Sequence, residues 1–111
     1  MPIETKQLES GIAVVTISGR LVLGKDEERL ETVTGDLIKE GQKRFVYDIS
    51  ALDYADSSGI GTLVSCLTNI KKADGDLRMA GANARMMRLF QMTGVQSLIQ
   101  LFPTVAAATA G

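Results

Sequence analysis

Apolar residues recur along this chain with two different periods, which predicts strands and helices in alternation. Four strand-like runs are rich in β-branched, aromatic or other apolar residues, and they cover residues 12–18, 44–49, 77–80 and 98–102. The run 3–8 alternates less cleanly, and Ser10-Gly11 after it predicts a hairpin turn into the first strand. Beyond a bend at Gly19, residues 21–23 are expected to continue that strand.

Helical periodicity separates the strands. Apolar residues spaced by three and four positions predict a helix over 26–40 that Gly41 closes, with acidic residues in the first turn, where the helix dipole favours them. The same spacing predicts a helix over 57–72, with two lysines in its last turn. For a third helix, Asn83 is expected to be the N-cap and Gly94 the C′ residue.

The order of these elements indicates the fold class. From residue 44 onward the order is strand, helix, strand, helix, strand, which builds parallel strands through right-handed crossovers. We therefore expect a small α/β domain in which a mixed sheet of four to five strands carries an N-terminal antiparallel hairpin and parallel βα units packed by helices. No Pro/Gly-rich linker divides the chain, so one domain is expected over 1–111, with 106–111 as a frayed or short helical tail.

Composition narrows the chemistry. The 111 residues include no histidine and one cysteine, which excludes a Ser-His-Asp triad, a histidine-bound metal and an intrachain disulfide. Lys and Arg number 12 against 13 Asp and Glu, for a formal net charge of -1, so the chain has no basic excess for nucleic acid. No apolar run is long enough to span a membrane, and the N-terminus lacks a signal-peptide pattern, so a cytoplasmic setting is expected.

One segment stands out chemically. Asp56-Ser57-Ser58-Gly59-Ile60-Gly61 lies where the predicted loop 51–56 meets the predicted helix over 57–72. Each glycine in a helix costs about 1 kcal/mol relative to alanine. The pair therefore indicates either a close backbone approach or tight packing of the helix on the sheet.

Three functional interpretations of this segment compete. A nucleophile elbow needs a base for its serine, and the chain holds no histidine. A phosphate cradle needs the lysine and glycine spacing of known nucleotide loops, which are missing. The third interpretation is a serine that is modified: a hydroxyl at a helix N-terminus is accessible to a kinase, and a phosphate there meets free N–H groups and the positive end of the dipole. The added charge would disrupt a packed or acidic interface.

The whole segment, and much of the chain around it, resembles a known family. The residues that carry the likeness are 46–50, Leu52, 56–61, Gly19-Arg20-Leu21, Met92-Thr93-Gly94 and 101–104. Together they resemble the STAS-domain anti-sigma factor antagonists. Asp-Ser-Ser-Gly-Ile-Gly between a strand and a helix is the most specific part.

The resemblance implies a protein switch with no cofactor. In that family the serine after the aspartate, here Ser57, is phosphorylated by a partner serine kinase of the GHKL type, which is also the anti-sigma factor. The unphosphorylated protein binds that kinase and releases the sigma factor, and a phosphatase restores the binding form. The resemblance further implies a monomer or weak dimer, with a contact surface over 52–65 and the start of the first helix. The expected recognition residues are Tyr54, Asp56, Ser58, Gly59, Ile60 and Gly61.

One position departs from the family pattern. Many members carry an acidic residue after Gly-x-Leu, whereas this chain has Val22. If that acid helps the kinase to recognise its substrate, this chain is a weaker substrate or has a divergent partner.

Two alternatives to the sigma-factor role stay open. A STAS subunit can serve as a structural partner in a transporter or signalling complex. An enzyme would have to rely on Asp53, Asp56 and Ser57 alone, with no base tuned near neutral pH, so no enzyme activity is expected. Leu52 and Tyr54 either pack on the core or join the contact surface, and Cys66 is expected to be a buried packing thiol.

Overall fold

The main sheet is mixed, and its strands follow the predicted order. In the computed structural model, which describes residues 3–110, five strands pair in the order β1-β2-β4-β6-β7. Their bounds are Ile3–Gln7 (β1), Ile12–Ile17 (β2), Arg44–Asp48 (β4), Asp76–Ala80 (β6) and Gln100–Phe102 (β7). β1 pairs antiparallel with β2, and every other neighbouring pair is parallel. The predicted N-terminal hairpin and parallel βα units are therefore confirmed.

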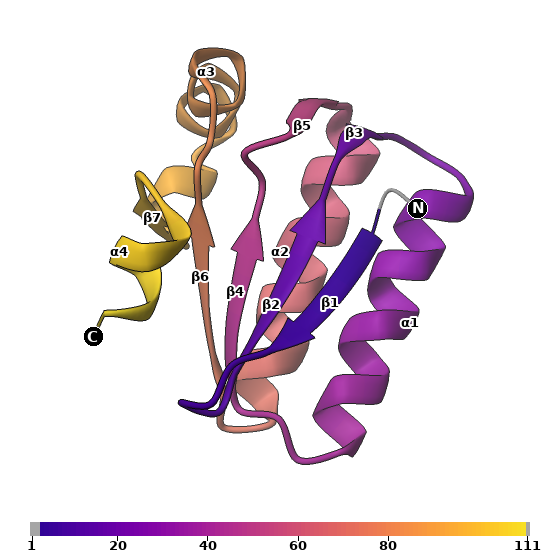
Figure 1. Ribbon diagram of the computed structural model, residues 1–111. Helices are drawn as coiled ribbons and strands as arrows, with labels where there is room; N and C mark the ends of the chain where they lie inside the picture. The colour runs from indigo at the N-terminus through magenta and orange to yellow at the C-terminus, as the bar shows by residue number, and fades with distance from the viewer. Residues whose placement is uncertain (1–2, 111) are drawn as a thin grey trace.

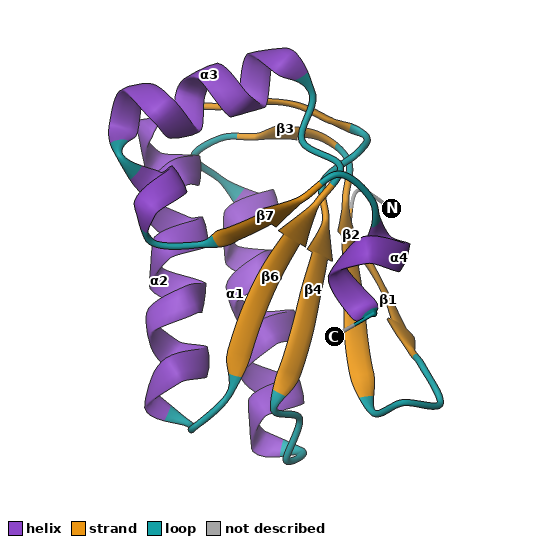
Figure 2. Ribbon diagram, turned by 90° about the vertical axis from the view of Figure 1, so that its left-hand side faces the viewer, coloured by secondary structure: helices purple, strands orange, loops and turns teal. Residues whose placement is uncertain are grey.

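Two long helices cover one face of this sheet. α1 (Lys25–Lys39) and α2 (Ser57–Lys72) lie side by side there, and α3 (Ala84–Thr93) crosses one end of the sheet (Figure 2). Fully buried side chains such as Val15, Tyr47 and Leu63 fill the layer between helices and sheet. Asn83 caps α3 by accepting from the Met86 N–H at 2.8 Å, and Gly94 ends it with a φ of 78°, as the sequence predicts.

A second, two-stranded sheet lies beyond the end of the first. β3 (Gly19–Leu21) and β5 (Leu52–Ala55) pair in parallel near the carboxyl ends of β2 and β4 (Figure 1). The predicted loop over 51–56 is thus wrong, and the predicted continuation of the first strand over 21–23 is a separate strand that ends at Leu21. The reason is non-local: the partner of each short strand is more than 30 residues away in the sequence.

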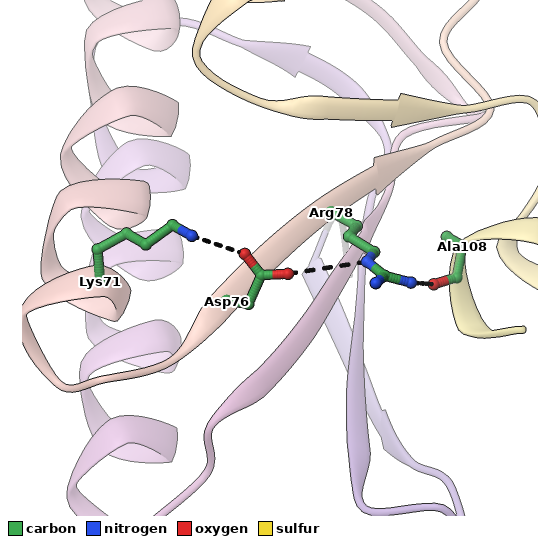
Figure 3. A network of polar contacts seen from close by, with 4 residues as sticks. All are labelled: Lys71, Asp76, Arg78 and Ala108. Atoms are coloured by element: carbon green, nitrogen blue, oxygen red, sulfur yellow. Dashed lines mark hydrogen bonds and ion pairs between the residues drawn. The ribbon is translucent and has the colours of Figure 1, made fainter. Parts of the chain in front are cut away.

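The opposite face of the main sheet is covered by α4 (Val105–Thr109), which follows a short 3-10 helix at Val95–Ser97 and strand β7. Ala108 of α4 packs with Ile12, Val14 and Val46 of the sheet. The Arg78 guanidinium donates to the Ala108 carbonyl at 2.9 Å and lies 3.7 Å from Asp76, which pairs with Lys71 at 2.8 Å (Figure 3). The predicted tail over 106–111 is therefore helical through Thr109, and Gly111 lies outside the described residues.

A small polar cluster lies inside the core beneath α1 and α2. The hydroxyl groups of Thr34 and Tyr47 are 2.5 Å apart. Burial raises the pKa of Tyr47 well above its ordinary value of 10.0, and the neighbouring Cys66 raises it further. Burial likewise raises the pKa of Cys66 from 9.0, against hydrogen bonds with Tyr47 and Thr34 that lower it. Cys66 is thus a buried, neutral thiol, as expected from its place on the apolar face.

Candidate functional site

The Asp56–Gly61 segment lies at the end of the molecule where the parallel strands of the main sheet terminate. β5 leads directly into α2 there, and the loop after β3 leads into α1, so the first turns of both helices lie at this end (Figure 1). In open α/β sheets this end is the usual place for functional sites, because loops rather than strands shape the surface there.

Asp56 organises this end through both of its carboxylate oxygens. It is the N-cap of α2, in extended backbone geometry with φ −82° and ψ −176°. Its Oδ1 accepts from the Gly59 N–H at 2.7 Å, and its Oδ2 accepts from the Leu23 N–H at 3.3 Å. The first bond stabilises the start of α2, and the second ties the loop after β3 to that start. With both oxygens accepting N–H bonds, Asp56 is a structural cap rather than a free base.

The two adjacent serines have different surroundings. Ser57, the first residue of α2, is exposed, and its hydroxyl has no hydrogen bond within the described part of the chain. Ser58 is half-buried, and its Oγ donates to Glu27 Oε1 on α1 at 2.9 Å. Only the Ser57 hydroxyl is therefore both accessible and unengaged.

The two glycines also differ. A Cβ on Gly59 would lie 2.0 Å from the Leu21 carbonyl oxygen of β3, so only glycine fits beneath that strand. A Cβ on Gly61 would meet nothing within 4 Å, and the residue is exposed. Close approach explains Gly59 alone, and no packing contact explains Gly61.

The remaining predicted recognition residues divide between core and surface. The Ile60 side chain is only 7% exposed and belongs to the core. Tyr54 is half-buried on β5, and the Arg20 guanidinium lies 5.4 Å from its ring centre. Leu52 is fully buried. Tyr54, Asp56, Ser57 and Gly61 thus reach the surface, whereas Gly59 and Ile60 support it from below.

Sequence reasoning missed two residues of this site, Leu23 and Glu27. Leu23 is 78% exposed in the loop after β3, where the Asp56 carboxylate holds its backbone. Its apolar type suggested a strand, and no local signal separates an exposed leucine from a strand residue. Glu27 is 6% exposed and contacts Ser58 and Thr62 on α2. In the sequence it is one of three acidic residues in a first helical turn, which is ordinary for a solvated helix start.

Residues 3–110 contain no group of three or more acidic or cysteine side chains placed to hold a metal ion. A groove of about 790 Å³ opens between β1 and α1, and its lining includes no residue of the Asp56–Gly61 segment. No described helix is long and apolar enough to cross a membrane.

What remains at this end is an exposed hydroxyl at the positive end of a sixteen-residue helix. Backbone N–H groups in the first turn of a helix lack intrahelical partners, so they can bind an added anion. The same end of the molecule carries the exposed apolar side chain of Leu23, whose N–H is bonded to Asp56, and the acidic first turn of α1.

The family model for the STAS domain matches residues 3–108 of this chain. This protein belongs to the STAS domain family. The match covers every strand and helix described above except the last residue of α4, and it includes the whole of the Asp56–Gly61 segment.

A curated relative and several solved structures are similar to this STAS protein. An anti-sigma-B factor antagonist of Listeria monocytogenes is 26% identical over 102 residues, which span 89% of this chain and 86% of the relative. The crystal structure of a putative anti-sigma factor antagonist from Thermotoga maritima superposes with a TM-score of 0.88 at 16% identity, over 97% of this chain and 92% of that one.

Two further structures show how widely the fold is used. The Bacillus cell fate determinant SpoIIAA in its phosphorylated form superposes with a TM-score of 0.70 at 17% identity, over 89% of each chain. A sulfate transporter family protein from Wolinella succinogenes superposes with a TM-score of 0.83 at 22% identity, over 95% of this chain and 87% of that one. At these identities the structures show the shared fold alone.

Proposed function

We propose that this STAS protein is an anti-sigma factor antagonist whose binding to an anti-sigma factor kinase is switched off by phosphorylation of Ser57. The observation that carries the proposal is the Ser57 hydroxyl, which is exposed and unengaged while the hydroxyl of Ser58 beside it is occupied. The Listeria relative, named an anti-sigma-B factor antagonist, supports the sigma-factor role. The solved phosphorylated form of SpoIIAA supports the modification.

Electrostatics explain how one phosphate would act as a switch. Phosphorylation adds about -1.5 to -2 charges at neutral pH. The first turn of α1, which includes Asp26 and Glu28, is already acidic. The phosphate would therefore give this end of the molecule a strong negative potential, and a partner surface that packs against it would be repelled or left with a buried charge. The fold itself would tolerate the phosphate, because it lies at the N-terminus of α2.

The proposed contact surface combines Ser57 with its apolar neighbours. Leu23 is held beside Ser57 by the Asp56 carboxylate, and Val22 next to it is half-exposed. Two adjacent apolar side chains at the surface can contribute buried apolar area to a protein interface. Val22 takes the place of the acid found in many family members, so this partner is expected to present an apolar rather than a basic group at that point.

The decisive experiment uses the anti-sigma factor kinase from the same genome and Mg-ATP. Peptide mass mapping is expected to find phosphate on Ser57 of the wild type and none on the Ser57→Ala variant. In pull-downs the wild type and Ser57→Ala should retain the kinase, whereas Ser57→Asp should lose it, and Thr68→Ala, which removes an exposed hydroxyl farther along α2, is the matched control that should behave as wild type. Phosphate on another residue alone, or equal binding by Ser57→Asp, would refute the switch.

A second candidate role is a structural STAS subunit of a transporter or signalling complex. The superposition on the Wolinella sulfate transporter family protein is the observation that supports this second role. Co-purification separates the two roles: recovery of transporter subunits in place of a GHKL-type kinase would favour the structural role.

A further inference from the structure

Glu27 is an unusual residue for its position. Glutamate is rarely buried unless its charge is paired. Glu27 is nevertheless 6% exposed, while its neighbour Glu28 on the same turn of α1 is exposed. Its carboxylate points across to α2, and none of its hydrogen bonds comes from a cationic side chain. Such a group needs an explanation in terms of what it contacts.

Both hydrogen bonds of Glu27 come from hydroxyl groups in the first turns of α2. Oε1 accepts from Ser58 Oγ at 2.9 Å and from Thr62 Oγ1 at 2.9 Å. Thr62 Oγ1 also lies 3.1 Å from the Ser58 carbonyl oxygen. Hydrogen bonds to a carboxylate are stronger than those between neutral groups. The Ser58 hydroxyl is therefore held in one orientation, with its proton directed at Glu27 and away from solvent.

The second oxygen, Oε2, is buried and has no hydrogen-bond partner within the described residues. A buried acceptor without a partner destabilises the folded state, and native proteins contain few such groups. A threonine or an alanine here would avoid that penalty. Glu27 therefore joins α1 to α2 through one oxygen only, and its contact with one of two adjacent serines indicates a role beyond that link.

We propose that Glu27 directs phosphorylation to Ser57 by withholding Ser58. This inference rests on the proposed function. In the reaction the Ser57 oxygen bonds to the γ-phosphorus of Mg-ATP, the bond from that phosphorus to the β–γ bridging oxygen breaks, and ADP leaves. The serine proton passes to a base of the kinase. Glu27 blocks the same reaction at Ser58 in two ways: it holds the half-buried Ser58 oxygen against α1, away from an incoming nucleotide, and its charge would lie against a phosphate formed there. Glu27 is thus a positioning residue, because it contacts neither the acceptor oxygen nor the nucleotide.

The test compares Glu27→Ala with the wild type under phosphorylation by the kinase and Mg-ATP. In the wild type we expect phosphate on Ser57 at least tenfold above Ser58. In Glu27→Ala the share on Ser58 should rise at least tenfold, and in the double variant Ser57→Ala/Glu27→Ala it should become the main product. Glu31→Ala, an exposed change one turn farther along α1 and outside its acidic first turn, is the matched control and should keep the wild-type ratio. A folded Glu27→Ala protein with the wild-type ratio overturns the inference.

If Glu27→Ala does not fold, Glu27→Gln takes its place. The amide keeps the shape of the side chain and removes the charge, so the share on Ser58 should rise at least threefold. An unchanged share in folded Glu27→Gln would then overturn the inference. The phosphate ratio reports the choice between two neighbouring hydroxyls, which a general loss of stability would not redirect.

A measurement without the kinase separates this inference from the proposed function. Three-bond Hα–Hβ couplings in NMR should show a single side-chain rotamer for Ser58 in the wild type, and rotamer averaging for Ser57. In Glu27→Ala or Glu27→Gln, Ser58 should become averaged as well. If Ser58 is already averaged in the wild type, Glu27 does not withhold it. Absence of any phosphate on the wild type would overturn the proposed function and with it the directing role of Glu27, whereas phosphate on Ser57 with Ser58 averaged between rotamers would overturn the role of Glu27 alone.

Discussion

The starts of α2 and α3 are built alike and differ in what surrounds them. Each helix follows a strand and begins after an N-cap in extended geometry, Asp56 for α2 and Asn83 for α3. The two cap bonds are nearly equal, at 2.7 Å to the Gly59 N–H and 2.8 Å to the Met86 N–H. The local stabilisation of the two helix starts is therefore similar.

The two helix starts differ in the second hydrogen bond that each cap side chain makes and in the residue that follows the cap. The Asn83 amide donates to the Leu52 carbonyl oxygen at 3.2 Å, which ties α3 to β5, and the next residue is Ala84. Asp56 instead holds the Leu23 loop, and the next residue is Ser57, whose hydroxyl is free. The same N-cap geometry thus has a structural role alone in α3, whereas in α2 it also places the exposed Ser57 hydroxyl at the start of the helix. Substitutions at matched positions test this distinction.

The strongest effect is expected at Gly59. In Gly59→Ala the new Cβ would lie 2.0 Å from the Leu21 carbonyl oxygen, so α2 or β3 has to move. We expect the free energy of unfolding to fall by about 3 kcal/mol, the upper range for overpacking. Gly61→Ala on the same helix is the control: it meets no neighbour and should raise the free energy of unfolding by roughly 0.5–1 kcal/mol. Urea denaturation measures both, and equal effects would show that the contact with β3 does not matter.

The two caps themselves give the sharpest test of the comparison. Asp56→Ala and Asn83→Ala each remove one N-cap, so each should lower the free energy of unfolding by about 1 kcal/mol. Asp56→Ala also releases the Leu23 loop and should weaken binding to the anti-sigma factor at least tenfold, while Asn83→Ala should leave binding unchanged. Chemical denaturation and calorimetric titration provide the two measurements. The comparison fails if both variants lose binding equally.

Two exposed apolar residues distinguish the surfaces beside the two helices. Leu23 is 78% exposed next to the start of α2, and Met92 is 76% exposed near the end of α3. Truncating either to alanine should leave stability within about 0.5 kcal/mol, because neither is packed. Leu23→Ala should weaken partner binding by about 1–2 kcal/mol, as expected for an interface anchor, and Met92→Ala should not change it. Affinity loss in Met92→Ala with none in Leu23→Ala would move the interface to α3.

The polar cluster in the core beneath α1 and α2 should make the stability of the fold depend on pH. The folded state keeps Tyr47 and Cys66 neutral because burial raises their pKa above 10.0 and 9.0, respectively. The unfolded chain ionises at those ordinary values, so the stability from the two groups is complete below about pH 9 and is lost as pH rises further. Urea midpoints should fall between pH 8 and 10.5, and the fall should be smaller in the Tyr47→Phe/Cys66→Ala double variant. Around neutral pH both side chains are neutral in the folded and in the unfolded chain, so the urea midpoint should not change with pH there.

Local sequence signals predicted the elements that rest on local physics. The α2 bounds, the Asn83 cap and the Gly94 end follow from apolar spacing and from residues whose side chains or backbone suit those positions. β5 was missed because four residues with one exposed aspartate give little alternation, and its partner β3 lies more than 30 positions upstream. The Glu27 contact was missed for the same reason, since Ser58 is 31 residues away and nothing local marks one glutamate of three as buried.

The backbone contacts at this end have a consequence for divergence between paralogues. The Leu21 carbonyl accepts from the Asp56 N–H at 3.3 Å, and the Leu23 N–H donates to the Asp56 carboxylate, so the loop is held through main-chain atoms of β3 and its extension. The side chains at 22 and 23 are therefore free to vary without moving Ser57. A genome that encodes several such proteins can give each a different apolar or charged pair at these two positions, keep one phosphorylation geometry, and so insulate parallel signalling circuits from one another.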